Sequence, residues 1–206
     1  MGGEGGAELT VPAALRALDN SKDLYLTLVG DRRRVDPLLT AVRQPGVTDR
    51  ITVQHAPTVV GDDDLPRNVL RSGRDSSMFQ AVELLQQDKV QAMVSAGNTG
   101  ALLMIGRHLL KTIAGIHKPA MLAAIPGSTQ QTFLLDVGAN PEVSAQHLFE
   151  FAVMGSVLAS SLNGSPARVG LLNIGAEHFK GTDEVREAAA MLESCSALDY
   201  IGFVEA

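Results

Sequence analysis

The sequence predicts an α/β protein with a mostly parallel sheet. Short runs rich in leucine and β-branched residues alternate with longer stretches of helical period, as expected when strands and covering helices follow one another. Three of the short runs end in small polar residues and glycine just before a helical stretch. The 206 residues, 45% hydrophobic and 19% charged, are typical of one folded globular domain.

These periodicities place the individual strands and helices. Strands are expected at residues 24–29, 51–55, 91–95, 121–125, 132–136 and 169–173. Helices are expected at residues 36–43, 76–87, 98–112, 140–162 and 183–194. Asn140 suits the N-cap of the fourth helix, and Pro141 suits its first turn. The polar stretches 31–36 and 61–75 are expected as surface loops or helix ends.

Charge and composition argue against several classes of protein. The net charge of −6 disfavours non-specific nucleic-acid binding, which depends on Lys and Arg. The basic run Arg32, Arg33 and Arg34 is expected as solvated surface or as a patch for an anionic partner. Cys195 is the only cysteine, which indicates a reducing cytoplasm. No apolar run reaches the roughly 20 residues of a membrane span, and no secretory signal is recognisable.

Metal and nucleotide motifs are not apparent in the sequence. Five histidines lack metal-ligand spacing: His55, His108, His117, His147 and His178. Glycines within residues 2–6 do not fit the dinucleotide fingerprint. Residues 175–182 resemble a phosphate-binding P-loop only superficially, because Lys180 precedes Gly181 instead of following it. That loop still presents Glu177 and Lys180 at the end of a strand, and a surface ion pair is the plainer interpretation.

Three loops that follow strands are the informative feature. Their residues are Ser95-Ala96-Gly97-Asn98-Thr99-Gly100, Asp136-Val137-Gly138-Ala139-Asn140 and Asn173-Ile174-Gly175-Ala176-Glu177. In open α/β sheets, ligands bind beyond the carboxyl ends of the strands, so these loops are expected to line one edge and converge.

The first loop suits an anion. Gly97 and Gly100 admit close approach of backbone, and the helix expected from Asn98 offers unpaired N–H groups at its positive end. Ser95, Asn98 and Thr99 add short polar side chains. Ordinary turn and cap chemistry is the alternative explanation for the same residues.

Four segments give the chain a family resemblance. They are residues 71–78 (RSGRDSSM), 94–102 (VSAGNTGAL), 135–140 (LDVGAN) continuing to 151–156 (FAVMGS), and 169–175 (VGLLNIG) with Glu177, Lys180 and Gly181. In sequence and spacing, nearly the whole chain resembles the phosphate:acyl-acyl-carrier-protein acyltransferases, the PlsX family. The resemblance implies a three-layer αβα fold similar to the isocitrate and isopropylmalate dehydrogenases and the phosphotransacetylases.

The resemblance also implies an activity and partners. Family members transfer a fatty acyl group from acyl carrier protein to inorganic phosphate, and the acyl phosphate feeds glycerol-3-phosphate acylation in phospholipid biosynthesis. A cytoplasmic homodimer is therefore expected, with peripheral membrane association and a glycerol-3-phosphate acyltransferase as a possible partner. Neither a metal nor an organic cofactor nor a nucleic acid is expected.

The chain departs from the family pattern at both ends. Glu4 stands where the family usually has Asp after Met-Gly-Gly, and Ala7 stands where proline is common. The family has a strand before this point and continues well past residue 206. Residues 1–206 are therefore expected to form a single, incomplete α/β domain that lacks the first strand and the C-terminal part.

On this resemblance, phosphate attacks the thioester carbonyl directly and no enzyme nucleophile is needed. Phosphate or oxyanion contacts are expected from Ser95, Asn98 and Thr99, next to the glycines Gly97 and Gly100.

The other two loops have supporting roles on the same resemblance. Lys180 is expected to neutralise charge, with Glu177 orienting it. Asn140 and Asn173 are expected as further polar donors, and Asp136 as a residue that orients its neighbours. Two alternatives remain: a phosphotransacetylase-like enzyme that uses coenzyme A thioesters, and a truncated, non-catalytic paralogue that only dimerises or binds a partner.

Overall fold

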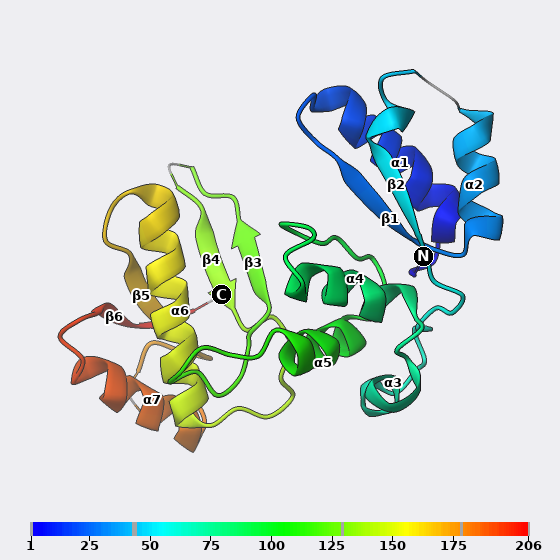
Figure 1. Cartoon of the computed structure of the whole chain (residues 1–206). Coiled ribbons are helices and arrows are strands. Elements are labelled where there is room, and N and C mark those ends of the chain that lie inside the picture. Colours follow the sequence, from blue (N-terminus) through cyan, green and yellow to red (C-terminus); the bar gives the residue numbers. More distant parts are fainter. Residues whose placement is uncertain (1, 43–44, 129, 178, 206) are drawn as a thin grey trace. The chain divides into compact units, whose positions relative to one another are not determined.

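The computed structural model describes residues 2–42, 45–128, 130–177 and 179–205 (Figure 1). The chain forms two units, an N-terminal unit of Met1–Lys111 and a C-terminal unit of Thr112–Ala206. Among the described helices, none is both long and apolar enough to cross a membrane.

Two helices and a parallel strand pair open the N-terminal unit. Strand β1 (Leu26–Gly30) pairs in parallel with β2 (Ile51–His55), which follows the short 3-10 helix η1 (Thr48–Arg50). Helices α1 (Gly6–Asn20) and α2 (Arg32–Ala41) pack beside this pair (Figure 1). Helix α1 was not expected, although its buried positions are spaced like the apolar stripe of a surface helix: Ala7, Val11, Leu15 and Leu18.

Three further helices follow in the N-terminal unit: α3 (Pro66–Ser72), α4 (Ser77–Gln86) and α5 (Thr99–Leu109). Ser76 caps α4 by accepting a hydrogen bond from the N–H of Phe79. These helices share a core of Val60, Val69, Met78, Phe79, Val82, Ala101 and Ile105. The helices expected at 76–87 and 98–112 are thus confirmed with shifted ends, and α3 lies within the polar stretch 61–75.

The prediction of a strand at residues 91–95 is wrong. These residues carry no strand in the described structure, and the side chain of Val94 is 99% exposed. A strand exists only through hydrogen bonds to a neighbour, and no described strand pairs with this segment. The apolar pattern of Met93 and Val94 therefore does not produce a strand here.

The described part of the C-terminal unit contains two strand pairs and two helices. Strand β3 (Leu122–Ile125) pairs antiparallel with β4 (Thr132–Leu135), and β5 (Arg168–Leu172) pairs in parallel with β6 (Asp199–Val204). Helices α6 (Ala145–Asn163) and α7 (Asp183–Glu193) pack against each other. The core holds Ala145, Leu171, Ala188, Ala189 and Leu192.

The start of α6 corrects the expected helix at 140–162. Ser144 is the N-cap, and its side chain and backbone exchange hydrogen bonds with His147 in a capping box. Asn140 is not a cap, because its side chain donates to Pro119 and Asp136 instead. Gly164, in the left-handed conformation, ends the helix.

The expected α/β fold class is confirmed, with one difference in the sheet. Two of the three described strand pairs are parallel, and helices alternate with strands along the chain. The β3–β4 pair is antiparallel, because the two strands are adjacent in sequence and joined by a short connection.

Candidate functional site

The Ser95–Gly100 loop leads directly into α5 and presents open hydrogen-bond donors. The hydroxyl of Ser95 accepts the N–H of Gly97 over 3.3 Å and keeps its own O–H free to donate. The N–H groups of Thr99 and Gly100, in the first turn of α5, have no acceptor among the described residues. Since Ser95 and Thr99 are exposed, these donors face solvent at the positive end of the helix dipole.

Asn98 fixes the shape of this loop. Its Oδ1 accepts the N–H of Ala101 over 3.0 Å, so Asn98 is the N-cap of α5. Its Nδ2 lies 3.0–3.1 Å from the backbone carbonyl oxygens of Gly61, Asp62 and Asp64. Both ends of the side-chain amide are therefore engaged, and the geometry gives Asn98 a positioning role. A direct contact with phosphate stays a prediction.

The N-terminal glycines pack on the same loop. A methyl carbon added to Gly2 would lie 3.3 Å from Cα of Gly97, and one added to Gly3 would lie 2.4 Å from the carbonyl oxygen of Ala96. Gly3 also has a φ of +80°, which favours glycine. Sequence reasoning missed this contact, and the only available signal was that Met-Gly-Gly is also part of the family pattern.

A hollow of about 350 Å³ lies where the glycine run meets the loop. Its lining comprises Gly2, Gly3, Glu4, Gly5, Gly6, Leu9, Thr10, Asp62 and Ala96. The glycines present backbone rather than side chains to this hollow, so the space next to Ala96 is open to a small ligand.

Asp136 and Asn140 form a compact polar cluster in the C-terminal unit. The carboxylate of Asp136 accepts N–H groups of Met121, Ala139 and Asn140 over 2.7–3.2 Å and the side-chain amide of Asn140 over 3.0 Å. Burial opposes ionisation, but these donors outweigh it and hold the pKa of Asp136 below its ordinary value. The carboxylate therefore holds the backbone around Asn140, and an orienting role of Asp136 in catalysis stays a prediction.

The loop after β5 carries the third group of expected residues. Nζ of Lys180 lies 2.8 Å from Oε2 of Glu177, with the two side chains 35% and 51% exposed. The hydrogen bond from Lys180 lowers the pKa of Glu177. Asn173 donates its Nδ2 to the carbonyl of Lys180 over 3.2 Å and accepts the N–H of Ile174. Asn173 thereby ties the strand end to the residue that bears the cation.

The structure groups the expected residues within each unit. Ser95, Gly97, Asn98, Thr99 and Gly100 lie in the N-terminal unit, whereas Asp136, Asn140, Asn173, Glu177 and Lys180 lie in the C-terminal unit. The expected convergence of all three loops stays a prediction. No group of three or more His, Cys, Asp or Glu side chains that suits a metal occurs among the described residues, and His178 lies outside them.

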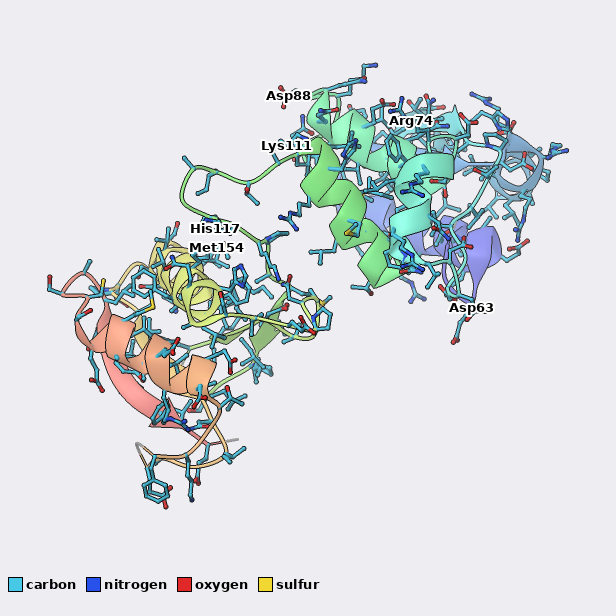
Figure 2. All side chains as sticks on the ribbon, turned by 90° about the horizontal axis from the view of Figure 1, so that it is seen from below. Asp63, Arg74, Asp88, Lys111, His117 and Met154 are labelled. Carbon is cyan, nitrogen blue, oxygen red and sulfur yellow. The ribbon has the colours of Figure 1, made fainter. Side chains whose placement is uncertain are left out.

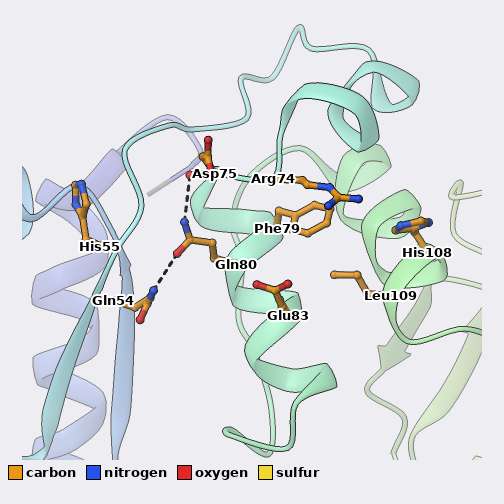
Figure 3. Close-up of a pocket in the computed structure, with 9 residues that line it drawn as sticks. All are labelled: Gln54, His55, Arg74, Asp75, Phe79, Gln80, Glu83, His108 and Leu109. Carbon is orange, nitrogen blue, oxygen red and sulfur yellow. Dashed lines mark hydrogen bonds between the residues drawn. The ribbon is translucent and has the colours of Figure 1, made fainter.

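A second, larger pocket of about 470 Å³ was not expected from the sequence (Figure 3). It is lined by Gln54, His55, Arg74, Asp75, Phe79, Gln80, Glu83, His108 and Leu109. Gln80 bridges two parts of its wall, accepting from Gln54 over 3.1 Å and donating to the carbonyl of Asp75 over 3.4 Å (Figure 3). Its charged side chains have both signs, so it does not select for an anion alone.

Curated relatives match the chain along its whole length. Proteins named phosphate acyltransferase from Legionella pneumophila (strain Paris), Nitrosococcus oceani and Pseudomonas fluorescens are 44%, 47% and 47% identical to it. Each match covers 100% of this chain, and the chain spans 60–61% of the length of these relatives.

A solved structure shows the same fold. The EutD phosphotransacetylase from Staphylococcus aureus is similar with a TM-score of 0.63 at 18% identity, over 95% of this chain and 65% of that one. The resemblance expected from the sequence motifs is therefore confirmed for the fold. The family model described as "Fatty acid synthesis protein" matches residues 1–206, so the chain belongs to this family, in agreement with the predicted PlsX resemblance.

Proposed function

We propose that the chain is part of a phosphate acyltransferase that moves a fatty acyl group from acyl carrier protein to inorganic phosphate. The name that its relatives carry, phosphate acyltransferase, supports the general reaction, and the family description supports a fatty acyl substrate. The acyl phosphate product would serve phospholipid biosynthesis. The enzyme would act as a cytoplasmic homodimer that associates peripherally with the membrane.

The open donors of the Ser95–Gly100 loop are the observation that carries this proposal. Phosphate needs several donors at close range, and a helix N-terminus supplies them without a formal charge. The Ser95 hydroxyl and the N–H groups of Thr99 and Gly100 bind the phosphate in this proposal. Gly97 leaves room for it, and Asn98 holds these donors in place through its bonds to residues 61–64.

The chemistry is a direct displacement. A phosphate oxygen attacks the thioester carbonyl carbon, a C–O bond forms, and the C–S bond breaks to release the thiolate of the carrier. Preorganised donors and one cation stabilise the negative charge of the intermediate. Lys180 supplies the cation after Glu177 releases it, and Asn173 positions the Lys180 backbone. Asp136 and Asn140 keep the β4–α6 connection in shape.

Phosphate-dependent release of the carrier thiol tests the proposal. The chain, and a version with the additional length of its relatives, are incubated with acyl carrier protein thioester, with and without phosphate. The proposal is supported if thiol and acyl phosphate form together and if the rate at which both form is lower in Ser95→Ala. Release with acyl-coenzyme A alone would favour a phosphotransacetylase-like enzyme. No release with any donor would leave a non-catalytic binding protein and refute the proposal.

A further inference from the structure

Three exposed arginines follow one another along α3 and the turn after it. Arg67 and Arg71 are four residues apart on the helix, and Arg74 comes two residues past its end. None of the three has an ion pair or side-chain hydrogen bond with a described residue. We name Arg67, Arg71 and Arg74 the arginine face; the side chain of Arg74 lines the larger pocket (Figure 3).

The packing of α3 turns this face toward solvent. Val69 is buried in the core shared with α4 and α5, and Leu70 packs against the same core. Arg67 and Arg71 recur at helical spacing on the side away from Val69, one turn or about 6 Å apart on the helix, and Arg74 follows in the turn after it. Positions of α3 that touch the core are therefore apolar, and the exposed side is cationic.

The basic run Arg32, Arg33 and Arg34 of the same unit differs from this face, because its side chains have partners. Arg33 pairs with Asp31 at 2.7 Å, and Arg34 pairs with Glu8 at 2.8 Å. Arg32 donates to the carbonyl of Val53 over 2.7 Å. The basic run at 32–34 is thus engaged internally, while the arginine face is available on a chain whose net charge is −6.

The arginine face is also connected to the Ser95–Gly100 loop. A methyl carbon added to Gly100 would lie 3.0 Å from Cγ of Pro66, the first residue of α3. Asn98 donates to the carbonyls of Asp62 and Asp64, which lead into α3. A partner that docks on α3 is therefore held next to the proposed phosphate loop.

We propose that the arginine face docks a carboxylate-rich protein surface, namely that of the protein that carries the acyl thioester. This inference rests on the proposed function and names where the acyl donor binds. Arginines one helical turn apart suit carboxylates spaced in the same way on a partner helix, with bidentate pairing. An anionic membrane suits the face less well, because the apolar side of α3 is buried in the core and is not available for insertion.

Binding of fluorescently labelled acyl carrier protein, followed by anisotropy in low salt, tests this docking. The variant carries Arg67→Glu, Arg71→Glu and Arg74→Glu. The control carries Arg16→Glu, Lys22→Glu and Lys89→Glu, which make the same change in net charge at exposed positions elsewhere in the unit. We expect binding to weaken by about tenfold or more in the variant and by less than about threefold in the control.

Equal weakening in both proteins, or no binding by the unaltered chain, would overturn the docking inference. The inference would also be overturned if the variant lost binding to anionic phosphatidylglycerol vesicles but still bound the carrier.

Measurements of turnover separate the docking inference from the proposed function. If the carrier binds through the arginine face but no thiol is released with any donor, the proposed function fails and the docking inference stands. If turnover with the carrier is unaffected by the variant, the docking inference alone fails.

Discussion

His117 holds the carboxylate of Glu150 at two points. Its backbone N–H donates to Oε2 over 2.7 Å, and its ring Nδ1 lies 2.5 Å from Oε1. Gln146 donates to the same carboxylate from the preceding turn of α6, over 3.1 Å. Glu150 is only 3% exposed, and burial opposes its ionisation. The hydrogen bonds outweigh burial and lower the pKa of Glu150 below its ordinary value of 4.5.

This arrangement predicts that Glu150 contributes to the loss of stability in acid. Because its pKa is lower in the folded state, its contribution is present above about pH 4.5 and is lost as the pH falls through the folded-state pKa. Glu150→Gln removes that contribution. Urea unfolding between pH 7 and pH 3 should therefore show a smaller decrease in the free energy of unfolding for this variant than for the unaltered chain.

Glu142→Gln is the matched control, because Glu142 is exposed near the start of the same helix. Glu142→Gln should leave the decrease in the free energy of unfolding between pH 7 and pH 3 the same as in the unaltered chain. If Glu150→Gln lost stability in acid as steeply as the unaltered chain, the carboxylate of Glu150 would not be the titrating group.

Asn98 offers a test of how the phosphate loop is held. Asn98→Asp keeps an acceptor for the N–H of Ala101 but places a carboxylate oxygen where Nδ2 faces three carbonyls. We expect this change to reduce the free energy of unfolding by about 2 kcal/mol or more, and to expose residues 61–64 to limited proteolysis. Thr182→Ala, which removes the N-cap of α7, should lose about 1 kcal/mol. Equal stability of Asn98→Asp and the unaltered chain would contradict the positioning role.

Local signals in the sequence predicted those elements that depend on local chemistry. Helix α7 begins at Asp183, within the range expected from its acidic first turn, and Thr182 caps it. The segment 91–95 has the same kind of apolar pattern as a real strand, but a strand also needs a neighbour, which its own residues do not specify. Asn140 and Pro141 look like a helix start, yet the Asn140 side chain is taken by Asp136, a contact that spacing alone does not reveal.

The candidate site likewise combines features that local sequence predicts with features that depend on distant contacts. The Ser95–Gly100 loop was recognisable because its small polar residues and glycines are contiguous. The packing of Gly3 on Ala96 joins residues far apart in sequence, and a pattern of glycines does not show which backbone they touch. The arginine face was also not expected, because α3 was not distinguished from the polar stretch around it.

We expect that breaking the ion pair between Lys180 and Glu177 lowers activity without a comparable loss of stability. The pair is partly exposed, so Lys180→Met should change the free energy of unfolding by less than about 1 kcal/mol. If Lys180 neutralises charge in the transition state, the same variant should lower phosphate-dependent acyl transfer by about 100-fold. Lys118→Met, which removes a cation that donates to the carbonyl of Glu142, should leave the rate unchanged. A Lys180→Met rate within twofold of the original would remove Lys180 from the mechanism.

Gly3 and Gly46 form a matched pair for testing the glycine contact with the phosphate loop. Their φ angles are +80° and +81°, so a methyl group at either position introduces similar backbone strain of about 1 kcal/mol. At Gly46 the added carbon meets no atom of a described residue within 4 Å, whereas at Gly3 it lies 2.4 Å from the carbonyl oxygen of Ala96. Gly3→Ala must therefore also displace the Ala96 segment. We expect it to lose more stability than Gly46→Ala in urea unfolding, and to raise the KM for phosphate severalfold where Gly46→Ala does not. Identical unfolding and identical phosphate saturation in the two variants would show that the contact between Gly3 and Ala96 does not shape the loop.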